Sequence, residues 1–381
     1  MATPPLLKRL NEETVLDTIR AGAPISRAEI ARRAGISKPT VSLALRSLLG
    51  AGLVREAADG PAGPTYGAVY FEPVPEAALV LGIDLGARFL RGALSDLTGS
   101  VRARQDVEVA GPDAQSALTA IVELRDALVR AAALSGDLID DVVVGVPGVV
   151  EQRGGVVRLA TNIPGLDGRR YGAELAERLG VRVTVENDVN LAALGERRLG
   201  VARGVDNFMF LSVGTGLGAG LVLHGELQRG HHGAAGELDY VAVGLEQELD
   251  PCAAALSGLA ERLAAGGERT SLASPYDARS VFAAAREGDV VARAIVREEA
   301  RRIALHIAPI AAVADVELVV LGGGIGTNAE LLADVRPLLD QWLPYPPRLE
   351  ISSLGDGAVL MGALSVGLDS ALGRVFLSRR P

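Results

Sequence analysis

Apolar residues recur at the spacing of one helix face near the start of the chain, at positions 15–19. Pro24 ends this predicted helix, because proline cannot continue one. A second helix is predicted over 26–34, where Ser26 followed by Glu29 has the form of a capping box whose carboxylate reaches back to the N–H of the cap. The pattern therefore predicts two short helices in close succession.

A glycine-centred turn separates the second helix from a third. Gly35 supplies the left-handed residue of the turn, Ser37 caps the next helix, and Pro39 stands in its first turn, where a missing N–H costs nothing. The apolar positions that face inward on this helix are Val41, Leu45 and Leu48. This spacing is typical of a helix-turn-helix module.

Polar residues occupy the outer face of the third helix near its N-terminal half, the part that enters the major groove of DNA in such modules. The candidate DNA-binding residues are Ser37, Lys38, Thr40, Ser42 and Arg46. The alternative is that each is an ordinary solvated position on a small helical bundle.

Short β-prone pieces alternate with glycine and proline over residues 55–73, as they do in the hairpin of a wing. Pro73 and Pro75 then stiffen a short connection to the rest of the chain. We therefore predict a winged helix-turn-helix domain over residues 1–72 and a linker over 73–77.

The remainder of the chain alternates strands and helices. From Leu79 three consecutive strands are predicted, and a helix over about 113–134 and a further strand follow them. From Asn207 a strand, a glycine-rich turn and a strand repeat this order. Two related halves predict an α/β body with two lobes, 78–190 and 191–381, and the C-terminal helix is able to return to the first lobe.

Composition limits the functional classes. The chain of 381 residues is 49% hydrophobic and 22% charged, which suits two or three domains. Its apolar runs are interrupted well short of the roughly 20 residues of a membrane span, and the N-terminus lacks the apolar segment of a signal peptide. We expect a cytoplasmic protein with no membrane partner. The single Cys252 excludes a disulfide framework and a multi-thiolate zinc site.

Charge is distributed unevenly along the chain. Residues 1–60 hold nine basic and six acidic side chains, a net charge of +3, whereas residues 61–381 hold 29 basic and 41 acidic ones, a net charge of -12. A polyanion is therefore attracted to the first domain and repelled by the rest. The surplus is compatible with DNA binding but too small to establish it.

Glycine-rich turns follow several strands of the body. Such turns let backbone N–H groups approach an anion, and two of them facing across a cleft can hold the phosphates of a nucleotide. The residues in these turns include Asp84, Gly86, Gly214, Thr215, Gly216 and Gly323. Their order over residues 78–373 resembles the ROK family of repressors and sugar kinases, which has a two-lobed actin-like ATPase (ribonuclease H-like) fold. The N-terminal module resembles the DNA-binding domain of the family's repressors.

The resemblance implies a sugar site between the lobes. Residues 160–165 resemble the family's asparagine-containing sugar loop, and residues 185–190 resemble the segment whose Asn and Asp hold sugar hydroxyls. The implied ligand-binding residues are Asn162, Asn187, Asp188 and Glu237. In the kinases the aspartate at position 188 is the general base, but a carboxylate also binds a hydroxyl without any transfer. Asn187 and Asp188 could instead simply cap the helix that follows.

Three departures from the family pattern argue against catalysis. The first phosphate turn has Ala87-Arg88 where the kinases have Gly-Thr, so that a long cation either obstructs the site or turns outward. Asp239-Tyr240 stands where the family has Gly-His, and the cysteine-rich zinc segment is replaced by residues 244–252. We expect vestigial nucleotide loops, no catalytic residue, no cofactor and no metal.

The leading hypothesis is a transcription repressor of carbohydrate metabolism. A homodimer or homotetramer would present its DNA-binding domains to a palindromic operator, and a sugar or sugar phosphate would bind between the lobes. The wing stretch 61–66 lacks an arginine that is common in such repressors. One alternative is an ATP-dependent sugar kinase with Asp188 as its base, which the retained glycines of 214–220 favour. Another is a repressor that a protein partner controls without a small ligand.

Overall fold

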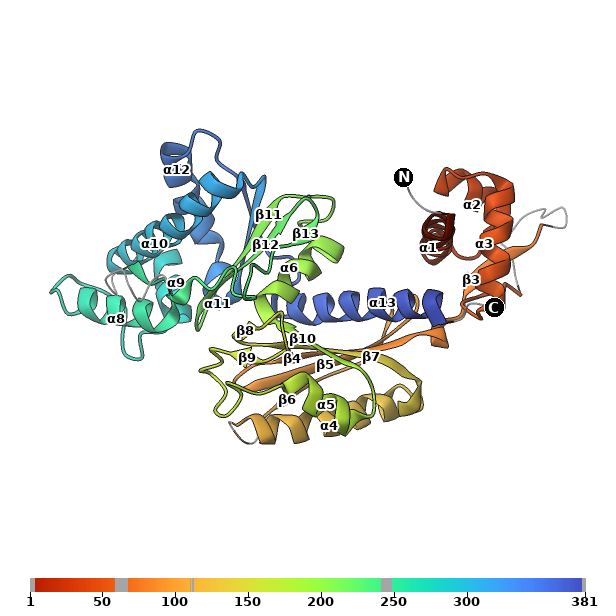
Figure 1. The fold of residues 1–381 in the computed structure, drawn as a ribbon. Helices are drawn as coiled ribbons and strands as arrows, with labels where there is room; N and C mark the ends of the chain where they lie inside the picture. The colour runs from red at the N-terminus through yellow and green to blue at the C-terminus, as the bar shows by residue number, and fades with distance from the viewer. Residues whose placement is uncertain (1–3, 59–67, 110, 112, 241–248, 379–381) are drawn as a thin grey trace.

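The computed structural model of the chain describes residues 4–58, 68–109, 111, 113–240 and 249–378. Figure 1 shows an elongated molecule with a small N-terminal domain at one end and two α/β lobes beyond it. The elements of the N-terminal domain are α1 (Pro4–Gly22), β1 (Ile25–Ser26), α2 (Arg27–Ala34), α3 (Lys38–Gly50), β2 (Val54–Glu56) and β3 (Tyr70–Pro73).

The predicted turn between α2 and α3 is confirmed. Gly35 has φ 67°, a left-handed conformation, and the Ser26 hydroxyl accepts a hydrogen bond from the N–H of Glu29 at 3.3 Å. The predicted reciprocal bond of the capping box is wrong, because the Glu29 carboxylate instead pairs with Arg32 and Arg33, at 2.6 Å each. Two guanidinium groups on the same helix offer stronger, charge-assisted donors than one backbone N–H.

The predicted wing is built from β2 and β3, which pair antiparallel and join β1 in a three-stranded sheet of order β1-β3-β2. The stretch 61–66, where the arginine is missing, lies outside the described residues. Strand β3 ends at Pro73, and the predicted linker contains the short helix η1 (Pro75–Ala77).

The first lobe is a five-stranded sheet of order β10-β7-β4-β5-β6. Helices α4 and α5 lie on one face of this sheet and α13 runs along the other (Figure 1). Every residue of β4 is buried, as expected for a strand with both faces covered. The elements of this lobe are β4 (Leu79–Leu85), β5 (Phe89–Asp96), β6 (Val101–Glu108), α4 (Ala114–Ala131), η2 (Gly136–Leu138), β7 (Ile139–Val146), β8 (Val149–Val150), β9 (Val157–Arg158), α5 (Tyr171–Leu179) and β10 (Val183–Asn187).

The second lobe holds another five-stranded sheet, of order β13-β12-β11-β14-β15. Helix α6 leads into it from the first lobe, and α13 returns from it to the first sheet. Its elements are α6 (Asp188–Leu199), β11 (Phe208–Val213), β12 (Leu217–Leu223), β13 (Glu226–Leu227), α8 (Ala253–Ala264), α9 (Ala278–Arg286), α10 (Val290–Ala314), β14 (Leu318–Gly322), α11 (Gly323–Gly326), α12 (Ala329–Trp342), β15 (Arg348–Ile351), η4 (Gly355–Gly357) and α13 (Ala358–Ser378). Among the helices so described, none is long and apolar enough to cross a bilayer.

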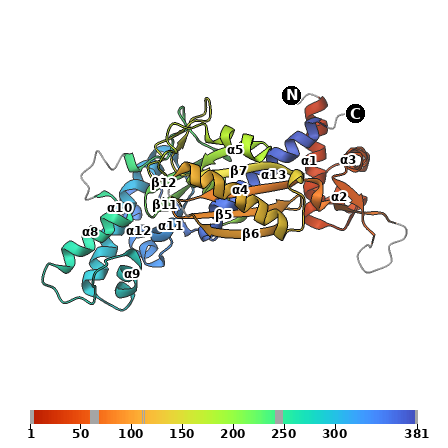
Figure 2. The ribbon, with the colours of Figure 1, turned by 90° about the horizontal axis from the view of Figure 1, so that it is seen from below.

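One hydrophobic core joins the N-terminal domain to the first lobe and α13. It includes Val15, Leu16, Ile19, Val41, Leu48, Val80, Ala93, Leu360, Leu364 and Leu368. Burial of these side chains against one another is the main force that holds the domain in place. In Figure 2, α1 and the C-terminal part of α13 lie side by side, in agreement with this shared core.

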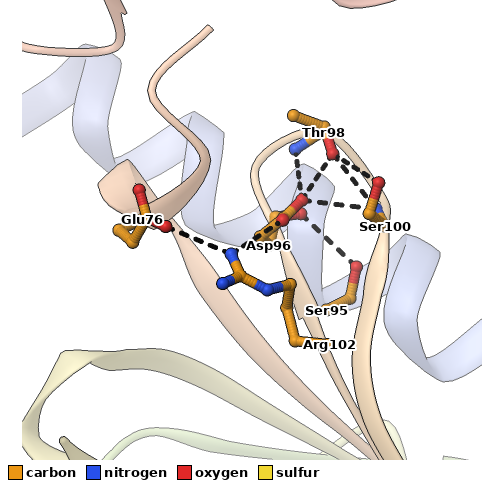
Figure 3. Close-up of polar contacts among 6 residues, drawn as sticks. All are labelled: Glu76, Ser95, Asp96, Thr98, Ser100 and Arg102. Atoms are coloured by element: carbon orange, nitrogen blue, oxygen red, sulfur yellow. Dashed lines mark hydrogen bonds and ion pairs between the residues drawn. The ribbon is translucent and has the colours of Figure 1, made fainter. Parts of the chain in front are cut away.

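Polar contacts also attach the linker to the turn between β5 and β6 (Figure 3). The N–H of Leu97 donates to the carbonyl of Pro75 at 2.9 Å, and Arg102 pairs with Glu76 at 3.1 Å and with Asp96 at 3.3 Å. Asp96 Oδ1 also accepts hydrogen bonds from the backbone N–H groups of residues 98 and 100. The N-terminal domain is therefore anchored to the first lobe by its core and by its linker.

Candidate functional site

The junction between β10 and α6 carries the two residues predicted to hold sugar hydroxyls. Asn187 caps α6, because its Oδ1 accepts the N–H of Asn190 at 2.9 Å, and its Nδ2 donates to the carbonyl of Gly148 at 3.0 Å. An asparagine amide has two N–H donors. Within the described residues Asn187 thus acts as a helix cap and keeps one donor for a ligand.

Asp188 begins α6 beside two further carboxyl groups. Its Oδ1 accepts the N–H of Val189 at 2.8 Å. Burial raises the pKa of Asp188 to about 7, and the nearby carboxylates of Asp84 and Glu237 add to the increase. These three residues form an acidic cluster at the meeting point of the lobes. A carboxyl group near half-ionisation at neutral pH can accept hydrogen bonds from sugar hydroxyls or take up a proton.

Asp84, at the end of β4, is held by an arginine that sequence reasoning missed. Arg91 donates to Asp84 Oδ2 at 3.1 Å and lies 3.6 Å from Asp106. Burial raises the pKa of Asp84, and Arg91 opposes this shift. The long cation of the altered phosphate turn does not obstruct this place: Arg88 is three-quarters exposed and pairs with Glu108 at 2.9 Å. Of the two alternatives for Arg88, the outward orientation is the one observed.

Glu237 follows a loop that is pressed against β12. Gly236 has φ +92°, and a Cβ at this position would lie 1.8 Å from the carbonyl oxygen of Ala219. The carbonyl of Gly236 accepts the N–H of Ala219 at 2.8 Å. Only glycine fits such an approach. Burial raises the pKa of Glu237, as expected for a carboxyl group enclosed beside others. The backbone at Gly236 thus fixes the position of Glu237 in the cluster.

An ion pair ties this loop to the start of α6. Arg229 Nε donates to Glu186 Oε2 at 2.6 Å. The other oxygen of Glu186 accepts from the N–H of Asn187 at 3.0 Å and from Asn190 Nδ2 at 3.1 Å. Sequence reasoning missed Glu186 and Arg229; the signal was an acidic residue at the end of a β-prone strand, directly before Asn187.

Among the described residues, Asn162 forms no hydrogen bond with the other predicted sugar residues. It is exposed in the loop between β9 and α5, and it makes no side-chain hydrogen bond within the described part of the chain. The loop itself is fixed: the N–H of Ala114 donates to the carbonyl of Pro164, and the N–H of Leu159 donates to Asp167 Oδ1. The assignment of Asn162 to the sugar site remains a prediction.

Two of the predicted nucleotide-binding turns, those after β11 and β14, lie next to each other at one edge of the second sheet, because these two strands are neighbours and run parallel. A Cβ on Gly214 would lie 3.5 Å from the backbone nitrogen of Gly324. The Asp239 carboxylate already occupies the turn after β11. Its Oδ1 accepts the N–H of Leu217 at 2.6 Å, and its Oδ2 would lie 2.7 Å from a Cβ placed on Gly216. Burial raises the pKa of Asp239. An anionic side chain thus lies where the resemblance implies phosphate binding.

The segment that replaces the family's zinc region is held by α10. Arg302 donates to the carbonyl of Asp250 at 2.9 Å, and His306 Nε2 lies 3.3 Å from the carbonyl oxygen of Leu249. Residues 244–248 of the segment lie outside the described residues. Across the described ranges, no three His, Cys, Asp or Glu side chains are grouped so as to hold a metal ion.

The outer face of α3 presents two cations. Lys38 and Arg46 are exposed, and neither forms an ion pair within the residues that the structure describes. The hydroxyls are partly engaged: Ser37 accepts the N–H of Thr40 at 3.3 Å, and Ser42 donates to the carbonyl of Lys38 at 2.9 Å. Arg27 of α2 donates to Ser42 at 3.3 Å and adds a cation that sequence reasoning did not select.

Comparison of this chain with known proteins shows which families its sequence matches. Residues 80–369 match the ROK family, and residues 12–63 match the MarR family. A protein named Xylose repressor from Caldicellulosiruptor bescii is 27% identical over 389 residues, covering 96% of this chain and 97% of that protein. A Glucokinase from Thermotoga maritima is 32% identical over 249 residues, covering 58% of this chain and 77% of that enzyme.

A solved structure shares the fold along nearly the whole chain. It is described as a ROK family transcriptional regulator and homolog of the E. coli MLC protein; the TM-score is 0.80, the identity 23%, and the match covers 97% of this chain and 98% of that chain. This likeness, with the two family matches, confirms the predicted fold class of a winged helix-turn-helix domain followed by a ROK sugar-kinase fold.

Proposed function

Because this chain belongs to the ROK family, we propose that it is a sugar-responsive transcriptional repressor that binds operator DNA through α3. One continuous fold contains both an exposed, cationic recognition helix and an acidic cluster suited to sugar hydroxyls. This combination is the observation that carries the proposal. The full-length match to a xylose repressor supports it.

The sugar ligand binds at the junction of the lobes, where Asn187, Asp188 and Glu237 supply hydrogen-bonding groups. Xylose is the first sugar to test, because the repressor that matches the whole length of this chain is named for it. Glucose is the second, since a glucokinase also matches. Asn162, which is exposed in the loop between β9 and α5, adds its amide group to this site.

Heat stabilisation tests the ligand site, because a ligand that binds only the folded state raises its melting temperature. We expect a saturable rise with one sugar of a panel that includes xylose and glucose. Asp188→Ala removes the rise, whereas Asp340→Ala, an exposed aspartate on α12, keeps it. Full sugar binding in the Asp188→Ala protein would refute the site, and the absence of any stabilising sugar would favour control by a protein partner.

The protein binds a palindromic operator as a homodimer or homotetramer that presents the DNA-binding faces of its subunits. Lys38 and Arg46 contact the major groove and its phosphates, and Ser37, Thr40 and Ser42 lie beside them. Lys38→Ala and Arg46→Ala should each weaken operator binding by about 1–3 kcal/mol if they read bases. Arg297→Ala, an exposed arginine on α10, is the matched control with unchanged affinity.

Sugar binding changes DNA affinity through the packed structure of the protein, because the shared core and the linker hold the N-terminal domain against the first lobe. The N-terminal domain is fixed to the first lobe, while α6 and α13 connect that lobe to the second. A coupling free energy of roughly 1–3 kcal/mol would change DNA affinity by about 5–150-fold.

The protein acts as a sensor and not as a kinase. Asp239 places a carboxylate against the glycine turn that would have to bind phosphate, and Arg91 already neutralises Asp84. The kinase is the second candidate, because a carboxyl with a pKa of about 7 at position 188 is suited to act as a base. Production of ADP from ATP with a stabilising sugar, lost in Asp188→Asn, would establish the kinase instead.

A further inference from the structure

A pocket lies away from the acidic cluster, between the N-terminal domain and the end of α6. Its volume is about 690 Å³, within the range of small-molecule sites. Three walls enclose it: α1 of the N-terminal domain, the turn between β5 and β6 of the first lobe, and the last turn of α6 with the loop after it. Helix α13 forms the floor, with apolar side chains such as Met361 and Leu364.

Four arginines line this pocket: Arg20, Arg197, Arg198 and Arg203. Two aspartates, Asp17 and Asp369, line it as well, so that the lining carries a net charge of +2. This surplus is unusual in a chain whose residues 61–381 carry a net charge of -12. Local positive charge in an otherwise acidic body indicates a place for an anion.

Arg20 is the most enclosed of the four. Its side chain is 11% exposed, and it donates to Asp17 at 3.1 Å. A Cβ on Gly99 would lie 3.7 Å from its Nη2, so the guanidinium extends from α1 to the turn of the first lobe. Its Nε is buried without a hydrogen-bond partner among the described residues. Burial lowers the pKa of Arg20, and the nearby positive charge of Arg198 lowers this pKa further, whereas the negative charges of Asp17 and Asp369 raise it.

The arginines of α6 and its loop are incompletely paired. Arg197 lies 3.4 Å from Asp206, and Asp369 attracts Arg198. Over the described ranges, neither Arg198 nor Arg203 forms a hydrogen bond or a close ion pair, and both are exposed to the pocket's solvent. Planar guanidinium groups match the oxygens of a phosphate or carboxylate in bidentate pairs. The pocket thus holds donors that protein groups leave unsatisfied.

We propose that this pocket binds a small organic phosphate, whose dianion pairs with Arg198 and Arg203 and is attracted by the charge of Arg20, and whose organic part rests on the apolar floor of α13. A phosphate monoester carries close to two negative charges at neutral pH, which balances the net charge of the lining. The volume exceeds that of a phosphate group, so the organic part has room beside it.

This site lies at the opposite end of α6 from Asp188. A helix of 12 residues is about 18 Å long, so the two sites are separate. The bound phosphate holds α1 of the N-terminal domain against the end of α6. It therefore sets the position of the recognition helix relative to the helix that begins at the acidic cluster.

Thermal unfolding with inorganic phosphate and with glycerol 2-phosphate tests the proposal, with sodium chloride at matched ionic strength as the control. We expect a saturable rise in melting temperature that chloride does not produce. The variant Arg198→Ala/Arg203→Ala should bind phosphate at least about tenfold more weakly, because charge-assisted hydrogen bonds are lost. Both positions are exposed, so the variant is expected to fold.

Two controls separate this site from others. Arg297→Ala removes an exposed arginine elsewhere, and Asp188→Ala alters the acidic cluster; both should keep the phosphate response of the unaltered protein. The proposal is overturned if phosphate gives no saturable rise, or if the double variant responds like the unaltered protein. An equal loss in Arg297→Ala would also overturn it, because the effect would then be one of overall charge.

A phosphate of the DNA backbone has the same chemistry, and DNA binding distinguishes the two sources. In phosphate-free buffer the double variant should bind DNA with the affinity and salt dependence of the unaltered protein. If its affinity falls and the dependence of log K on log salt becomes shallower, the arginines contact the DNA backbone and the small-molecule site is refuted.

Discussion

Removal of the Asp239 charge should let the second phosphate turn accept a nucleotide. The carboxylate accepts the N–H of Leu217 at 2.6 Å and closely approaches Gly216. A phosphate that shared this turn would stand about 4 Å from the carboxylate, where two unit charges repel by about 1 kcal/mol in water and about 4 kcal/mol at a protein surface. Because Asp239 is half-buried, the net penalty for ATP lies between these limits, about 5- to 1000-fold in affinity.

Two variants separate charge from shape. Asp239→Asn keeps an oxygen acceptor for the N–H of Leu217 but removes the charge, and Asp239→Gly restores the residue type that the family has there. Isothermal titration with ATP and magnesium should give a dissociation constant at least about fivefold lower for both variants than for the unaltered protein. Tight ATP binding by the unaltered protein, with no gain in Asp239→Asn, would refute the reasoning.

Three further predictions follow from the site and the core. Sugar affinity should rise about tenfold between pH 6 and pH 8, because the ionised fraction of a carboxyl with a pKa of about 7 rises from about 1/11 to about 10/11 and the ionised form is the better acceptor. Calorimetry should show a flat profile for Asp188→Asn, and a flat profile for the unaltered protein would contradict this. A double-mutant cycle with Glu186→Gln and Arg229→Met should give a coupling of about 1 kcal/mol in sugar affinity, because their ion pair ties the Glu237 loop to α6; strictly additive losses would argue against that link. Leu16→Ala should lower the free energy of unfolding by about 2–5 kcal/mol, because Leu16 is 1% exposed in the core shared by the N-terminal domain and α13; a change under about 1 kcal/mol in urea denaturation would show that this core is not continuous.

Local features of the fold were predictable from the sequence because their causes lie within a few residues. Gly35 and Ser37 define the turn of the N-terminal domain through backbone conformation and a hydroxyl cap. The strands from Leu79 and from Asn207 follow from short apolar runs bounded by turns. The capping box failed for an equally local reason, since Arg32 and Arg33 compete for the Glu29 carboxylate.

Features that depend on distant partners were not predictable in the same way. Glu186 meets Arg229 from 43 positions away, and the role of Asp239 appears only once Leu217 is placed beside it. The phosphate-binding pocket likewise needs the packing of α1 against α13 and the end of α6, three elements far apart in the chain. Rules based on the spacing of residues along the chain do not predict such contacts, because these rules describe one helix or strand at a time.

Fluorescence anisotropy of labelled DNA from upstream of the protein's own gene, at fixed salt and with and without a sugar panel, tests the central claim most directly. The account predicts binding that is tighter than to random DNA and that one sugar changes by about 5–150-fold. Binding no tighter than to random DNA, or selective binding that no sugar alters, would contradict it.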